Sequence, residues 1–563
     1  MNENPGSDNK DTHSDQTVEP AALPRILLIS AMQEELDPLW ELSQFAWSDL
    51  REQGDAIWYR SCVHDGYELI SACAGEMGLT ATSILQTKLI LQWRPILVVM
   101  IGICGGLADA GIAVSDVIFS TAALQYQTGK LLDNKLISKV REVSANPALV
   151  NLVQQFIAAH DGEMRIKYGD DRPETNPKLF TGAYASADLV VKDSQKFDEA
   201  LHAGEDVKAL DMEGFAAMYT AQELHVPFGS LIVKSVSDHA DKDKTKLYRE
   251  FVKFTSTSVA VKFLTEAFMP WHKQQTTNMM NVPSVRSSGG RRAEPRILVI
   301  CGEQLAFEYL KHSGLRWKTR DMSTIYPQLV LTTHIRNVSI VATSLLAGRT
   351  GLVEGAMRTT MLVRYWQPTM AILIGSCGGF KNYTKLGDLV IASRAFHYQF
   401  GGFKESELQA EIRSVDLIDR IRGYLQAISA TYISTLVKRA YKGFKEKKFS
   451  RRPTETPDWH IQPLASSDLF IRDAAQVSRV ILKDRKTIAV DMEGYAFMRS
   501  IQHQRLPLGG LIIRTVANHA DILKGKSVTD YANYSSAYVT AKLLHKLVDV
   551  VNATNDYSYS PIA

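Results

Sequence analysis

The chain has 563 residues and a formal net charge of +3, and 45% of its residues are hydrophobic against 22% that are charged. A chain of this length exceeds a single hydrophobic core, and the composition is that of an ordinary globular protein. The small net charge favours neither a nucleic acid nor an acidic membrane as partner, and we expect the chain to bind neither.

The first 23 residues are polar and have no apolar period, which predicts a disordered tail. They lack the apolar core of a signal peptide, and the apolar run 96–103 is too short to span a bilayer. The five cysteines form no CxxC pair, so we expect neither a metal site nor a disulfide framework. We therefore predict a cytoplasmic protein that needs no cofactor.

Strands and helices alternate along the rest of the chain. A β-branched strand opens at Arg25, helical stretches cover 80–92 and 213–223, and a second such strand opens at Arg296. This alternation predicts α/β sheets with helices on both faces. A segment rich in Gln, Asn, Ser and Gly separates two large pieces and predicts a flexible linker. The predicted organisation is a tail over 1–23, a first domain over 24–272, a linker over 273–294, a second domain over 295–553 and a C-terminal tail over 554–563.

The two large pieces are copies of one another. RILLIS at Arg25 returns as RILVIC at Arg296, and IGICGG at Ile101 returns as IGSCGG at Ile374. ALDMEG and SVSDHAD return in the same order as AVDMEG and TVANHAD, and the spacing changes only by small insertions. This pattern indicates a duplicated domain and excludes a short-period solenoid.

The Gly-rich turn after the buried strand lets backbone N–H groups approach a ligand, although a tight strand-to-loop turn explains such a pattern equally well. With DMEG at 211–214 and SVSDH at 235–239, the chain resembles the purine nucleoside phosphorylase and uridine phosphorylase superfamily. Within it, the chain is similar to the methylthioadenosine/S-adenosylhomocysteine nucleosidases. The resemblance implies an α/β fold of two tandem nucleoside phosphorylase-like domains, each with a central mixed β-sheet flanked by helices.

The resemblance also implies roles for single residues. In the nucleosidases an early strand ends in Ala-Met-Glu-Glu-Glu, whose last carboxylate activates the attacking water, and AMQEE at 31–35 implies Glu35. The Glu of the Met-Glu motif grips the ribose hydroxyls, which implies Glu213, and the Asp of the Ser-Asp strand end protonates the base, which implies Asp238. The expected substrate-binding residues of the first domain are Met212, Val190, Val191, Gly75, Gly105 and Ser237.

The chemistry of N-glycoside cleavage needs these residue types independently of the family. Positive charge develops on the sugar and negative charge on the departing base, so one carboxylate must be ionised while another acid donates a proton. The alternative explanations are a favourable charge at a helix N-terminus for Glu35 and a turn cap for Asp238. Glu213 lies in an apolar helix start, where a buried carboxylate without a function is costly.

The second copy departs from the pattern at two of these three positions. Ala306 stands at the position of Glu35, and Asn518 stands at the position of Asp238. We therefore expect the second domain to be degenerate, and either structural, ligand-sensing or changed in its chemistry. Its candidate binding residues are Ser376, Phe470, Met492, Glu493 and Asn518.

Hydrolysis is favoured over phosphorolysis, because Met100 and Leu373 stand where bacterial purine phosphorylases of the superfamily carry an arginine. We therefore predict a purine nucleoside or nucleotide N-glycosidase in the first domain. The alternatives are a non-catalytic nucleotide-binding or scaffold protein and a phosphorolytic enzyme. A basic stretch at 438–452 is typical of a solvated face, and a cradle for nucleotide phosphates is its alternative. Some segments resemble superfamily variants in signalling and defence proteins.

Nucleosidases of this type are dimers in which a loop of one subunit helps to close the site of the other. The resemblance therefore implies that the two copies pack face to face as an intrachain pseudo-dimer, with the second copy completing the first site. Assembly of such pairs into a homo-oligomer stays open.

Overall fold

The computed structural model describes residues 23–42, 44–53, 57–132, 135–169, 171–190, 204, 206–239, 248–276, 294–321, 329–345, 349–404, 407–428, 430–446, 450–520 and 528–555.

The first half is built on a 10-stranded mixed sheet with strand order β12-β10-β6-β13-β5-β1-β4-β3-β2, and β9 pairs with β6. The central strands are apolar on both faces, as expected for strands covered by helices on each side. The strands are β1 (Arg25–Ser30), β2 (Arg51–Gln53), β3 (Ile57–His64), β4 (Tyr67–Cys73), β5 (Leu97–Gly106), β6 (Val117–Gln125), β9 (Arg141–Ser144), β10 (Leu179–Ser186), β12 (Val207–Asp211) and β13 (Ser230–Asp238).

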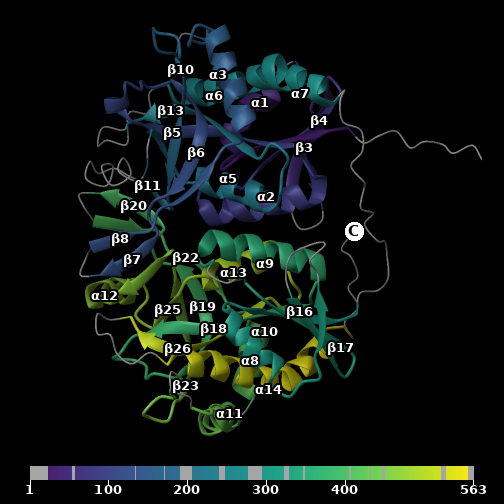
Figure 1. Ribbon diagram of the computed structural model, residues 1–563, viewed down its shortest axis with the longest axis vertical. Coiled ribbons are helices and arrows are strands. Elements are labelled where there is room, and N and C mark those ends of the chain that lie inside the picture. The colour runs from purple at the N-terminus through teal and green to yellow at the C-terminus, as the bar shows by residue number, and fades with distance from the viewer. Residues whose placement is uncertain are drawn as a thin grey trace, which may run out of the picture.

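Helices cover both faces of this sheet, as the sequence predicts. In Figure 1, α2 and α5 lie on the face toward the second half, and α3, α6 and α7 lie on the outer face. The helices are η1 (Gln33–Glu35), α1 (Asp37–Glu41), α2 (Leu79–Trp93), η2 (Ala108–Ala110), α3 (Pro147–Ala159), α5 (Gly214–Glu223), α6 (Arg249–Phe263), a π-helical turn η3 (Leu264–Phe268) and α7 (Met269–Thr276).

The second half repeats this architecture on another 10-stranded sheet, with order β15-β16-β17-β14-β18-β25-β23-β19-β22 and with β26 paired to β18 and β19. Its strands are β14 (Arg296–Cys301), β15 (Lys318–Asp321), β16 (Leu329–Ile335), β17 (Val338–Ser344), β18 (Met370–Gly379), β19 (Leu389–His397), β22 (Arg413–Asp416), β23 (Trp459–Ser466), β25 (Ala489–Asp491) and β26 (Gly510–His519). Its helices are α8 (Gln304–Lys311), α9 (Leu352–Trp366), α10 (Asp419–Ala427), α11 (Ala430–Gly443), α12 (Ala474–Lys483), α13 (Gly494–His503) and α14 (Thr529–Asn555).

The two halves pack face to face, as expected from the resemblance. Helices α2 and α5 lie against α9 and α13 at the centre of the molecule (Figure 1). Strands also cross between the halves: β11 (Leu189–Val190) pairs with β20 (Gly401–Lys404), which continues to β21 (Glu407–Ala410). In the reciprocal contact, β24 (Leu469–Arg472) pairs with β7 (Gly129–Leu132), which continues to β8 (Lys135–Ser138). The chain is therefore an intrachain pseudo-dimer.

The domain boundaries differ slightly from the prediction. Helix α7 continues to Thr276, so the first residues of the predicted linker are helical, and the last helix continues to Asn555. The added residues are polar, and Lys273, Gln274 and Gln275 are exposed, so these helices continue beyond the last side chains that pack on the core. The predicted N-terminal tail, apart from its last residue, and most of the linker lie outside the described residues. Within the described part of the chain, no helix is both long and apolar enough to cross a membrane.

Candidate active site

Glu35 is held at the Gly-rich turn that follows β5. Its Oε1 accepts a hydrogen bond from the Ile103 backbone N–H at 3.1 Å, and its Oε2 accepts one from the Met32 N–H at 3.0 Å. Gly102 has a φ of +146°, and a Cβ atom there would lie 2.4 Å from Glu35 Oε1. The glycine is therefore required by the close approach of the carboxylate, which also caps the start of η1 through the Met32 N–H.

Burial raises the pKa of Glu35 above its usual value, the nearby Glu213 carboxylate adds to this shift, and Lys234 opposes it. Only 7% of Glu35 is exposed, so the carboxylate lies in a dry environment. A carboxylate with a raised pKa is a stronger base once it is ionised, which suits the activation of a water molecule.

A buried lysine connects the carboxylates beneath the site. Lys234 Nζ lies 2.8 Å from both Asp211 Oδ2 and Glu213 Oε2, and the other oxygen of Glu213 accepts the Gly78 N–H at 3.1 Å. Burial lowers the pKa of Lys234, but the carboxylates of Asp211 and Glu213 outweigh it and raise the pKa above the usual value. The motif analysis missed Lys234, although a lysine inside the apolar strand LIVKSV must have an anionic partner.

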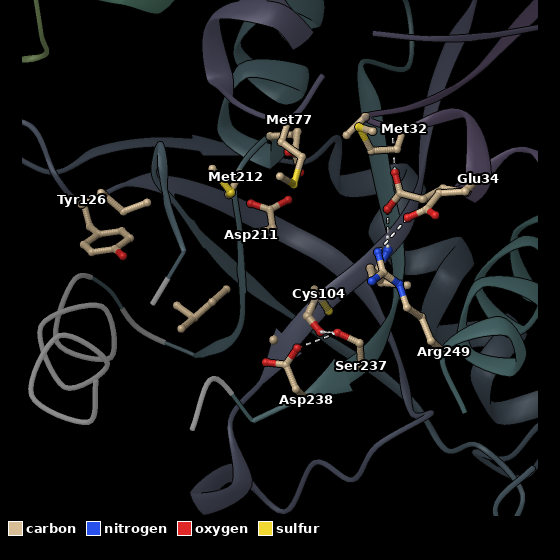
Figure 2. Close-up of a pocket in the computed structure, with 17 residues that line it drawn as sticks. Met32, Glu34, Met77, Cys104, Tyr126, Asp211, Met212, Ser237, Asp238 and Arg249 are labelled. Carbon is tan, nitrogen blue, oxygen red and sulfur yellow. Dashed lines mark hydrogen bonds and ion pairs between the residues drawn. The ribbon is translucent and has the colours of Figure 1, made fainter. Parts of the chain in front are cut away.

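Asp238 ends β13 opposite Gly105 of β5 in the sheet register. The Ser237 hydroxyl lies 2.9 Å from Asp238 Oδ2 and 3.2 Å from the Cys104 carbonyl oxygen, which orients the pair at the strand end. In Figure 2, Ser237 and Asp238 lie on one side of the cavity, while Met77 and Met212 lie across it. This position suits a proton donor to a leaving group held between the two sides.

One cavity of about 170 Å³ brings the three predicted catalytic carboxylates, Glu35, Glu213 and Asp238, together. Its walls also include Met212, Gly105 and Ser237, as predicted from the motifs. The remaining residues that line it are Ala31, Met32, Glu34, Met77, Ile103, Cys104, Tyr126, Leu189, Leu210, Asp211 and Arg249.

One predicted binding residue, Gly75, is not among the described residues that line this cavity. Gly75 instead lines a neighbouring cavity of about 410 Å³, together with Trp40 and His503. Val190 belongs to β11, whose other residue, Leu189, supplies the side chain in the active-site wall. Val191 lies outside the described residues. Leu189, which directly precedes the two predicted residues in the sequence, is the described residue of this segment that lines the cavity.

The second half keeps the same network with different residues. Arg514 takes the place of Lys234, and its Nη2 donates to Asp491 Oδ2 and Glu493 Oε2, each at 2.8 Å. Burial, together with Asp491 and Glu303, raises the pKa of Glu493 to about 7 against the opposing effect of Arg514. Ala306 is fully buried in the core of α8, so no carboxylate stands at the position of Glu35.

Glu303 is a carboxylate of the second half that the sequence comparison missed. It stands at the position of Met32 in the repeat, and the Ser376 hydroxyl donates a 2.5 Å hydrogen bond to its Oε1. A Cβ atom on Gly375 would lie 2.5 Å from Arg514 Nη1, just as one on Gly102 would meet Glu35. The Arg514 guanidinium therefore fills the space that the Glu35 carboxylate occupies in the first half. Asn518 lies opposite Gly378 next to the end of β26, and Asp238 lies opposite Gly105 at the end of β13.

Other residues that the motifs share have scaffold roles. His239 Nε2 lies 2.9 Å from the Ile112 carbonyl oxygen, and His519 Nε2 lies 3.1 Å from that of Thr384. The basic stretch 438–452 begins in the last turns of α11 and continues beyond the end of this helix. The buried side of α11 carries Ile433 and Leu436. Among the described residues, no group of three or more His, Cys, Asp or Glu side chains is arranged to hold a metal ion.

The comparison with known families agrees with this geometry. A model described as the phosphorylase superfamily matches residues 25–264 and 296–551, one match for each half. The chain belongs to this superfamily.

Curated relatives in the superfamily are distant. ATP nucleosidase Cap17 of Escherichia coli is 25% identical over 202 residues, which are 34% of this chain and 39% of the relative. The uncharacterized protein y4jS of Sinorhizobium fredii is 25% identical over 35% of this chain and 48% of its own length. A 5'-methylthioadenosine/S-adenosylhomocysteine nucleosidase of Desulfotalea psychrophila is 23% identical over 35% of this chain and 76% of its own. The matched part of this chain therefore covers less than half of the length of the Cap17 and y4jS proteins.

Solved structures in the superfamily cover one half of the chain. The 5'-methylthioadenosine/S-adenosylhomocysteine nucleosidase of Helicobacter pylori has 19% sequence identity and a TM-score of 0.37, and the match covers 43% of this chain and 99% of that structure. Futalosine hydrolase of the same organism has 18% identity and a TM-score of 0.36, covering 43% of this chain and 98% of its own.

Proposed function

We propose that the first half is a hydrolytic N-glycosidase that releases a purine base from a nucleoside or nucleotide. The observation that carries the proposal is the meeting of Glu35, Glu213 and Asp238 in one cavity, although they come from three separate parts of the chain. The names of the curated relatives, which include an ATP nucleosidase and nucleosidases of 5'-methylthioadenosine and S-adenosylhomocysteine, support the same reaction class.

In this mechanism Glu35 activates a water molecule, and Glu213, which pairs with Lys234, binds the ribose hydroxyls. The positive charge that develops on the sugar is stabilised by these carboxylates. Asp238 donates a proton to the departing base, and its hydrogen bond with Ser237 holds it in place. The products are the free base and the free sugar, with the elements of water divided between them.

Water is favoured over phosphate as the attacking group. The one cationic residue among the described residues lining the cavity is Arg249, and it already pairs with Glu34 at 2.7 Å. The backbone N–H of Ile103, in the Gly-rich turn, already donates a hydrogen bond to Glu35. A phosphate ion would meet carboxylates on most sides of this cavity, and like charges repel it.

The test is base release from adenosine, methylthioadenosine, S-adenosylhomocysteine, AMP and ATP, followed by chromatography with and without added phosphate. Release of a purine base that does not depend on phosphate is expected from at least one of these. Release that requires phosphate would show that the reaction is phosphorolysis and not hydrolysis. If no base is released from any of these compounds, the scaffold alternative is favoured.

A second candidate function is ligand binding without hydrolysis in the second half. Glu493, Ser376 and Glu303 keep polar groups at the equivalent strand ends, whereas Arg514 fills the space of the water-activating carboxylate. Met492, Phe470 and Asn518 are the further binding residues of this proposal. Calorimetric titration of Asp238→Asn with the best substrate would give two binding sites per chain if this half binds, and Glu493→Gln should then remove one.

A further inference from the structure

The loop 75–78 shapes the active site of the first half. Met77 lines the cavity, and the Gly78 N–H donates a 3.1 Å hydrogen bond to Glu213 Oε1. Gly75 and Gly78 have φ angles of +75° and +114°, in the left-handed region that glycine favours. Two conformationally free positions therefore flank Glu76 and Met77, so the orientation of the cavity wall must be fixed by contacts from outside the loop.

These contacts come from the second half of the chain. Arg413 Nη1 donates a 2.6 Å hydrogen bond to the Met77 carbonyl oxygen, and the Arg413 guanidinium lies 3.4 Å from the centroid of the Phe400 ring. Arg499 donates to Glu76 Oε1 from Nη2 at 2.7 Å and from Nε at 3.1 Å. A planar guanidinium that is stacked on a ring and bonded to a carbonyl has little freedom to move.

Residues of both halves pack closely around Gly78. A Cβ atom on Gly78 would lie 2.7 Å from Asp188 Oδ1 and 3.0 Å from Phe400 Cε2. Asp188 in turn accepts the Leu79 N–H at 2.7 Å and precedes Leu189, which lines the cavity. The loop is therefore enclosed by its own half on one side and by the second half on the other.

We propose that Arg413 of the second half is a positioning residue for the active site of the first half. It acts through the Met77 carbonyl and fixes both the Met77 side chain and the Gly78 N–H that orients Glu213. This inference rests on the proposed N-glycosidase activity of the first half. It gives the second half a role in catalysis that does not depend on ligand binding at its own site.

The first experiment measures base release by Arg413→Met, which keeps the aliphatic stem and removes the donors. We expect kcat/KM to fall by roughly 10- to 100-fold, because small displacements of substrate-positioning groups have effects of this order. Arg394→Met is the matched control: Arg394 is also in the second half and pairs with Asp416 at 2.7 Å, but it is 42% exposed. The control should keep the kcat/KM of the unmodified chain.

A double-mutant cycle with Met77→Ala separates positioning from general destabilisation. If Arg413 acts through the loop, the losses of kcat/KM in Arg413→Met and Met77→Ala are not additive, whereas independent effects add. Arg413→Lys, which can still donate to the Met77 carbonyl, should recover part of the loss and serves if the methionine variant does not fold. Additive losses, or variants that lose stability with unchanged kcat/KM, overturn the inference. No base release from the unmodified chain would instead overturn the proposed function.

Discussion

At the scale of single residues, the halves differ at the end of the first strand and at the buried cation. The first half combines Glu35 with Lys234, and the second combines Ala306 with Arg514. In the first half the Glu35 carboxylate occupies the space next to the glycine of the turn, and in the second half the Arg514 guanidinium occupies the equivalent space. The larger cation therefore compensates for the missing carboxylate. The two differences between the halves therefore belong together.

Asp238→Asn should reduce base release by about 10²–10⁴-fold, the usual effect of losing one general acid, and should leave folding nearly unchanged. The second half carries Asn518 at the equivalent strand end, so the fold accommodates an amide there. Chromatography of the released base and a thermal melt would test this. Turnover at the level of the unmodified chain would remove Asp238 from the mechanism, and Asn518→Asp is the matched variant expected to change little.

Glu35→Gln should also reduce turnover sharply while a purine ligand still binds. The unmodified enzyme should lose kcat/KM on the acidic side, because a base must be deprotonated and burial raises the pKa of Glu35 above its usual 4.5. Lowering the pH through this raised pKa protonates the base, so the decline begins at a higher pH than an exposed glutamate would give. A pH–rate profile for both proteins checks the expectation. A profile of unchanged shape and height in Glu35→Gln contradicts it.

Lys234→Arg should keep the ion pairs with Asp211 and Glu213 but lower base release. In the second half, Arg514 directs Nη1 into the space that Glu35 occupies in the first half, so the two side chains compete for one volume. Steady-state kinetics of Lys234→Arg and of Arg514→Lys would compare matched exchanges at equivalent positions. The second should leave base release unchanged, and equal effects of both exchanges would contradict this explanation.

At the scale of elements, two helix N-termini meet near the centre of the pseudo-dimer. Asp188 Oδ1 accepts the Leu79 N–H at the start of α2, and Asp468 Oδ1 accepts the Leu352 N–H at the start of α9, each at 2.7 Å. Burial and then the nearby Asp468 raise the pKa of Asp188 to about 7, and burial raises the pKa of Asp468 to about 6. The crossing strands begin directly after these residues, so both caps lie where the halves join.

Asp188→Asn should make stability less dependent on pH. Because the folded pKa of about 7 exceeds the usual 3.8, the stabilisation is complete below 3.8 and is lost as the pH rises through 7. A group with this pKa loses about 1.4 kcal/mol of stability between pH 6 and pH 8. The loss of stability between pH 6 and pH 8 should therefore be about 1.4 kcal/mol smaller for the asparagine variant, which keeps the acceptor for Leu79. An equal pH dependence in both proteins would refute the assignment.

At the scale of the whole molecule, equivalent positions of the two halves carry opposite charges where they meet at the interface. The first half presents Glu76 to Arg499 and His503, and at the equivalent positions the second half presents Arg349 to Tyr219 and Glu223. Burial alone would raise the pKa of Glu76, but His503 and Arg499 lower it to about 2. Two first halves would bring Glu76 against Glu223, so the charges favour pairing between unlike halves.

Glu76→Arg should therefore destabilise the chain, and Arg499→Glu in the same chain should restore part of the loss. The coupling energy of such a contacting pair is roughly 0.5–3 kcal/mol. Denaturant unfolding of both single variants and the double variant would measure it. The exposed pair of Arg394 and Asp416 is the control and should couple by less than about 1 kcal/mol. A coupling near zero at Glu76 and Arg499 would contradict a role in pairing.

The sequence by itself determined the duplication, the α/β architecture and the meeting of Glu35, Glu213 and Asp238. Each of these depends on local pattern or on motifs at strand ends, and the ends of neighbouring parallel strands meet at one edge of a sheet. The helices at the two domain ends continue a few residues further than predicted. The placement of Gly75 was less accurate, because it depends on packing against segments distant in the chain.

Only the tertiary structure decided what surrounds these residues. The pairing of Lys234 with two carboxylates, the contact of Glu303 with Ser376 and the hold of Arg413 on Met77 all join positions far apart in sequence. A motif fixes which side chain stands at a strand end, but burial and neighbouring charges are properties of the folded assembly. Those properties set the pKa of Glu35 and the shape of the cavity, and the second half contacts the cavity wall through Arg413, a residue that its own motifs do not include.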